Sequence, residues 1–94
     1  MNHRLHDLND ELTDSQESYL AAKRELKIAE AELWIDPEID WEQEVGKSKP
    51  TQKDKESWIT LQLETRKQDV DEKYIAYQYA QRQYDIAMGE LNES

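Results

Sequence analysis

The chain contains no cysteine and no long run of apolar residues. The first absence excludes disulfide bonds and thiolate zinc sites, and it is typical of proteins in a reducing compartment. The second excludes a membrane-spanning helix, which needs about 20 predominantly apolar residues. The first ten residues are polar and lack the hydrophobic stretch of a signal peptide. We therefore expect a cytoplasmic protein that makes no membrane contact.

Basic residues are also scarce, because 12 lysines and arginines stand against 22 acids and give a net charge of −10. Phosphate backbones and anionic lipid headgroups attract basic surfaces, so direct binding to nucleic acid or membrane is disfavoured. The electrostatically preferred partner is a protein with a basic surface.

Sequence motifs of known chemistry are missing as well. No phosphate loop, dinucleotide fingerprint or nucleophile elbow is present. His3 and His6 are three residues apart near the N-terminus, without obvious further ligands for a metal. We therefore expect a non-enzymatic protein with no catalytic residue, no cofactor and no metal.

Glycine and proline are rare, with two of each, and both prolines and one glycine lie between residues 36 and 50. On each side of this segment, apolar residues recur at alternating steps of three and four, which is the spacing of a coiled-coil seam. The first stripe is Leu5, Leu8, Leu12, Ser15, Tyr19, Ala22, Leu26, Ala29 and Leu33. The second is Ile59, Leu63, Arg66, Val70, Lys73, Tyr77, Ala80, Tyr84, Ala87 and Leu91.

The two stripes predict one all-α domain over residues 1–94, a long antiparallel two-helix hairpin. We expect the first helix over about 3–35, a connecting tip over 36–50 and the second helix over about 51–91. Asn2 is a candidate cap of the first helix, and Thr51 with Asp54 resembles a capping box for the second. Within the tip, Asp36 and Pro37 predict the start of a short helical turn.

If the two helices pair, the residue numbers of each facing pair add up to 92. Met1 then lies opposite Leu91. Large residues then face small ones, as when Ala29 meets Leu63 and Ala87 meets Leu5, which favours a closely packed seam. Arg66 and Lys73 interrupt the seam, where their aliphatic stems can cover apolar neighbours and their charges can fix the register. The rival interpretation is two independent helices in a larger oligomer.

Apolar residues outside the seam form a candidate dimer face. Their number suits a four-helix bundle made by two copies better than an isolated pair of helices. The alternative is a different protein that lays a helix on this surface. The face comprises Ala21, Ile28, Ile35, Ile75, Tyr79 and Ile86.

All three tryptophans fall near the tip, where the segment from Asp36 to Glu44 holds five acids and no base. One interpretation is a small local core. The other is a recognition surface in which aromatic anchors bind a basic partner. The candidate partner-binding residues are Trp34, Ile39, Asp40, Trp41, Glu42, Glu44 and Trp58.

The second half of the chain resembles small phage-encoded helical proteins. The likeness rests on a polar loop containing Gly46, the charged helix start Lys53-Asp54-Lys55-Glu56-Ser57-Trp58, and a long helix rich in Ala, Gln and Arg. This resemblance implies an accessory or regulatory protein that acts by binding in the host cytoplasm.

The overall layout also resembles the secreted helical hairpins of the WXG100 type. The turn reads Trp41-Glu42-Gln43-Glu44-Val45-Gly46, without Trp-x-Gly, and no Tyr-x-x-x-Asp/Glu export signal follows in the last helix. The sequence is therefore compatible with three functions. The first is an adaptor or regulator that binds protein. The second is an acidic inhibitor that imitates nucleic acid and blocks a nuclease or another nucleic-acid-binding protein, and the third is a secreted hairpin.

Overall fold

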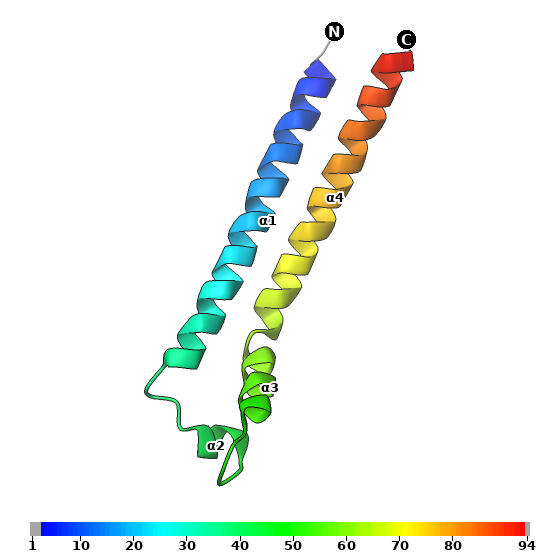
Figure 1. Cartoon of the computed structure of the whole chain (residues 1–94). Coiled ribbons are helices and arrows are strands. Elements are labelled where there is room, and N and C mark those ends of the chain that lie inside the picture. Colours follow the sequence, from blue (N-terminus) through cyan, green and yellow to red (C-terminus); the bar gives the residue numbers. More distant parts are fainter. Residues whose placement is uncertain (1–2, 94) are drawn as a thin grey trace.

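The computed structural model describes residues 3–93, which fold into four helices and no strand. The helices are α1 (His3–Ile35), α2 (Trp41–Val45), α3 (Gln52–Gln62) and α4 (Glu64–Glu93). Figure 1 shows α1 and α4 lying antiparallel, with α2 and α3 at the end of the rod opposite the two termini. The rod measures 69 × 18 × 15 Å. The predicted all-α class and the elongated hairpin shape are confirmed.

The seam between the helices is the one that the heptad spacing predicts. In α1, every residue of the predicted stripe is buried or half-buried, and Trp34 is the only other residue that is not exposed. A seven-residue repeat keeps the same positions turned toward the partner helix along its whole length. Among the described residues, the buried apolar side chains all belong to the two stripes: Ala22, Ile59, Leu63, Ala80 and Ala87.

Two of the predicted seam positions differ in the structure. Arg66 is exposed, although it lines a depression together with the seam residues Ala22 and Leu26. Leu91 is 49% exposed, and its expected neighbour Met1 lies outside the described residues, as does the candidate cap Asn2. The tight part of the seam therefore ends before the last turn of α4.

Lys73 is half-buried in the seam and forms an ion pair within its own helix. Its Nζ lies 2.8 Å from Oδ2 of Asp69, one turn earlier in α4. This hydrogen bond raises the pKa of Lys73 above its ordinary value, with a smaller contribution from the charge of Glu25 on α1. Because the partner is intrahelical, the pair stabilises α4 and does not by itself select a register against α1.

The second long helix is interrupted, which corrects the prediction of one helix over 51–91. Leu63 separates α3 from α4, with φ −96° and ψ 4°, outside the α-helical region. The Leu63 N–H still donates to the Ile59 carbonyl at 3.1 Å, and the Leu63 carbonyl accepts from the Lys67 N–H at 2.9 Å. The Leu63 side chain is only 6% exposed. The buried Leu63 therefore stands at an interruption of the helix that no glycine or proline signals in the sequence.

The start of α3 is fixed by the predicted capping box. The Asp54 N–H donates to Oγ1 of Thr51 at 3.2 Å, and the Thr51 N–H donates to Oδ2 of Asp54 at 3.0 Å. Lys47 adds an ammonium 3.2 Å from the same carboxylate. These contacts, led by the bond from the Thr51 backbone, hold the pKa of Asp54 below its usual range.

The short helix of the tip begins later than the sequence predicts. Asp36 does not cap a helix, because its Oδ1 accepts from the Glu38 N–H at 2.9 Å in a local turn. The N-cap of α2 is Asp40, whose Oδ1 accepts from the Gln43 N–H at 3.3 Å. Gly46 ends α2 with φ 78°, a left-handed conformation that glycine adopts without steric cost.

Candidate binding surfaces at the tip and along the rod

The three tryptophans of the tip pack against one another. The ring centroids of Trp34 and Trp41 are 6.1 Å apart, and those of Trp41 and Trp58 are 5.4 Å apart with the planes at 79°. Nζ of Lys55 lies 5.4 Å from the centroid of the Trp41 ring. All three indoles are half-buried. The cluster, which we call the tryptophan core, joins α1, α2 and α3 and holds the tip together.

The other candidate residues of the tip surround this core. Ile39 is half-buried, whereas Asp40, Glu42 and Glu44 are exposed. Asp40 is already used as the N-cap of α2. The tip therefore presents carboxylates to solvent, while its indoles make contacts within the chain.

The six residues of the candidate dimer face, on α1 and α4, are all exposed. The exposed fractions of Ile35, Tyr79 and Ile75 are 78%, 66% and 64%. Ile75 and Tyr79 line an open depression of about 600 Å³ on α4. Tyr74, Gln78 and Arg82 are among the other residues that line it. The lining combines apolar and aromatic side chains with polar and charged ones.

Tyrosines link the seam to this depression. The ring centroid of Tyr19 on α1 lies 5.1 Å from that of Tyr74 and 5.9 Å from that of Tyr77. Tyr77 is half-buried in the seam, and Tyr74 is 41% exposed. The tyrosines thus pack between α1 and α4, and part of their surface remains accessible beside Ile75.

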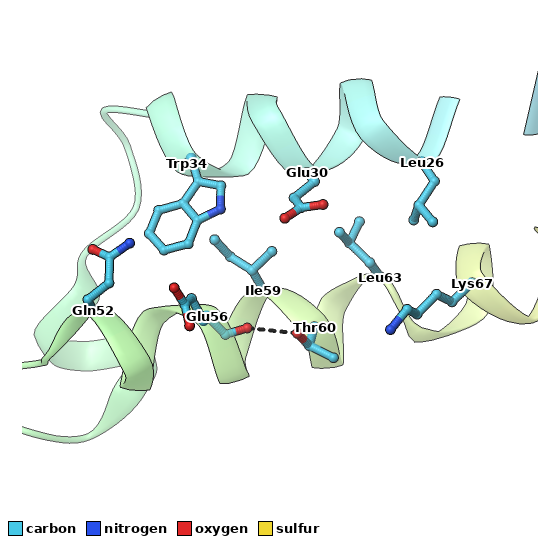
Figure 2. A pocket seen from close by; sticks show the side chains of 9 residues that line it. All are labelled: Leu26, Glu30, Trp34, Gln52, Glu56, Ile59, Thr60, Leu63 and Lys67. Atoms are coloured by element: carbon cyan, nitrogen blue, oxygen red, sulfur yellow. Dashed lines mark hydrogen bonds between the residues drawn. The ribbon is translucent and has the colours of Figure 1, made fainter. Parts of the chain in front are cut away.

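The sequence did not indicate a groove of about 430 Å³ between the end of α1 and α3. Figure 2 shows Glu30 and Trp34 on one wall, and Glu56 and Ile59 on the wall that faces them. We call it the tip groove. It is lined by Leu26, Glu30, Trp34, Gln52, Glu56, Ile59, Thr60, Leu63 and Lys67.

The spacing of its residues is the signal that could have revealed this groove. Leu26, Glu30 and Trp34 follow one another at steps of four, as do Gln52, Glu56 and Thr60. Such steps place residues on one flank of a helix. Once the two helices are paired, the two flanks meet beside the seam.

Neither a metal cluster nor a membrane span is found in the described part of the chain. Within residues 3–93, no group of three or more His, Cys, Asp and Glu side chains is placed to hold a metal ion. Nε2 of His6 lies 3.9 Å from Oδ2 of Asp10, one turn further along α1. No described helix is both long enough and apolar enough to cross a bilayer.

Comparisons with known proteins add no family to this picture. No protein-family model, no curated protein and no solved structure matches the chain.

Proposed function

We propose that this chain is a non-enzymatic protein–protein interaction protein, an adaptor or regulator that forms a dimer through its candidate dimer face. The observation that carries the proposal is the exposure of Ile75 and Tyr79, at 64% and 66%, on a rod whose seam is already filled. The packing of α1 on α4 uses the seam residues, with Tyr74 and the Arg4–Glu90 ion pair beside them, and does not use Ile75 or Tyr79. The exposed apolar residues are therefore available for a second interface.

The thin core of the rod supports association. A cross-section of 18 × 15 Å accommodates two helices, so only one stripe of each helix is buried within the hairpin. Small domains with so little interior usually gain stability from oligomerisation, metals or disulfides. The chain has no cysteine and therefore no disulfides, so association is one of the remaining sources of stability.

A second copy of the hairpin fits this surface. Two antiparallel pairs that bury a further apolar stripe each form a four-helix bundle, and a two-fold dimer uses the same residues on both copies. Complete burial of one isoleucine side chain contributes about 1.5–3 kcal/mol. Ile28, Ile75 and Ile86 occur twice in such an interface, which favours association despite the like charges of the two copies.

Light scattering tests the proposal through the mass of the particle in solution. We expect wild type to have twice the mass of the chain and the Ile75→Glu/Tyr79→Glu variant to have the mass of one chain. The matched control is Thr13→Glu/Gln16→Glu, which adds the same charge at exposed positions of α1 outside the face. The control variant stays dimeric. A monomeric wild type, or a dimeric Ile75→Glu/Tyr79→Glu variant, contradicts the proposal.

A further inference from the structure

The tip groove carries one glutamate on each of its two walls, over buried apolar side chains. Ile59 and Leu63 are 2% and 6% exposed and lie between α1 and α3. Glu30 on α1 and Glu56 on α3 stand on opposite walls, as Figure 2 shows. Its volume of about 430 Å³ lies within the range of roughly 300–1,000 Å³ that is usual for ligand pockets.

The carboxylates of the groove are not used within the hairpin. Among residues 3–93, no lysine, arginine or histidine forms an ion pair with Glu30 or Glu56. The dashed line in Figure 2 joins the Thr60 hydroxyl to the Glu56 main-chain carbonyl, which leaves the Glu56 carboxylate available. Two unpaired acids beside an apolar surface are complementary to a cation that brings apolar surface with it.

Trp34 makes the groove more specific. Its half-buried indole belongs to the groove and lies at the same end as Glu56, with Glu30 one turn away along α1. A guanidinium group stacks on a tryptophan face and donates paired hydrogen bonds to carboxylates. An ammonium group is a point charge that lacks this planar fork.

We propose that the tip groove binds an arginine side chain of a partner protein, together with an apolar residue next to it. The guanidinium lies between Glu30 and Glu56 over Trp34, and the apolar residue lies on the half-buried Leu26. This inference rests on the proposed function as a binding protein, and it adds the chemistry of the partner.

Lys67 favours one orientation of the partner segment in the groove. It lines the groove at the end that Leu26 and Leu63 occupy, away from Trp34. A second basic residue at that end meets a like charge, which is unfavourable. The preferred segment therefore has one arginine at the Trp34 end and an uncharged apolar residue at the Lys67 end.

NMR spectroscopy with two dipeptides tests this proposal. The probes are N-acetyl-Leu-Arg-amide and N-acetyl-Leu-Gln-amide, added to the intact chain while the indole N–H signal of Trp34 is followed. We expect a saturable shift with the arginine dipeptide and about tenfold weaker binding of the glutamine dipeptide, because a lost charge-assisted interaction of about 1.4 kcal/mol corresponds to that factor. Equal binding of the two probes, or no saturable shift of Trp34, overturns the proposal.

A pair of variants assigns the effect to the two carboxylates. Glu30→Gln/Glu56→Gln should weaken binding of the arginine dipeptide about tenfold. The control Glu11→Gln/Glu17→Gln removes the same charge from exposed positions of α1 far from the groove, and it should bind like wild type. Equal losses in both variants mean that only net charge attracts the probe, which overturns the assignment.

Two further results keep this proposal separate from the dimer. If the dimeric wild type gives no response to the arginine dipeptide while the monomeric Ile75→Glu/Tyr79→Glu variant does, a second copy occupies the groove, which overturns the proposal. The mass of the particle is measured on the same samples. A dimer that does not bind the arginine dipeptide refutes the groove alone, whereas a monomer that binds it refutes the dimer alone.

Discussion

The indole of Trp41 meets the indole of Trp58 edge to face, with ring centroids 5.4 Å apart and planes at 79°. This contact connects α2 to α3, and Trp34 extends it to α1. Edge-to-face pairs contribute about 0.5–1.5 kcal/mol beyond the burial of their area. The tip is therefore held to the rod by side-chain packing as well as by the chain connection.

Replacing Trp41 by alanine should weaken this part of the molecule. We expect Trp41→Ala to lower the free energy of unfolding by about 2 kcal/mol, less than for a fully buried tryptophan because the side chain is half-buried. Urea unfolding followed by far-UV circular dichroism measures the change. The neighbouring Glu42→Ala, at an exposed position, should stay within about 0.5 kcal/mol of wild type. Equal stability of the two variants contradicts the packing role of Trp41.

Ile59 and Leu61 provide a direct test of the seam. They are two residues apart in α3, yet Ile59 is 2% exposed and Leu61 is 65% exposed. Ile59→Ala should lower the free energy of unfolding by about 2–4 kcal/mol, since it leaves a cavity between α1 and α3. Leu61→Ala should change it by less than about 0.5 kcal/mol. If thermal or urea unfolding shows the larger loss for Leu61→Ala, the register of the seam is wrong.

The pH dependence of stability should reflect Asp54. Its pKa is lowered in the folded chain by hydrogen bonds from Thr51 and Lys47. A lowered folded-state pKa means that the carboxylate stabilises the fold above its unfolded-state pKa of about 3.9. This contribution is lost as the pH falls through the folded-state pKa. Wild type should therefore be more stable than Asp54→Asn near neutral pH, and unfolding curves should show the difference shrinking in acid. A difference that grows in acid contradicts the capping box.

The sequence was sufficient to predict the seam because its information is periodic. Residues from Leu5 to Leu33 repeat without interruption, and the heptad alone decides which side faces the partner helix. The capping box at Thr51 was also predictable, because its two residues are three apart in the sequence.

Other features depend on tertiary contacts that no local pattern records. Asp36 and Asp40 both suit an N-cap, and the folded tip uses Asp40. The interruption at Leu63 lies among good helix formers, where helix propensity does not predict it. The tip groove forms where α1 and α3 come together. The sequence contains its residues but does not show that they make one site.

Salt distinguishes a dimer held by apolar contacts from one held by opposite charges. Each copy carries a net charge of −10, so two copies repel each other and screening reduces that repulsion. Raising the salt from about 0.05 M to about 0.5 M should leave the dimer unchanged or tighten it, because the Debye length falls severalfold. Sedimentation across this series measures the dissociation constant. Dissociation at high salt would indicate an interface held by opposite charges.

The most direct test of the dimer uses the absence of cysteine, which permits a single spin label at Gln78→Cys. Gln78 lines the same depression as Ile75 and Tyr79. Packed helices have axes about 8–10 Å apart, so we expect one main distance of less than about 30 Å between labels on two copies, measured by double electron–electron resonance. Mixing with excess unlabelled chain should remove this signal. An absent signal, or only longer distances in a sample of dimeric mass, contradicts the proposed interface.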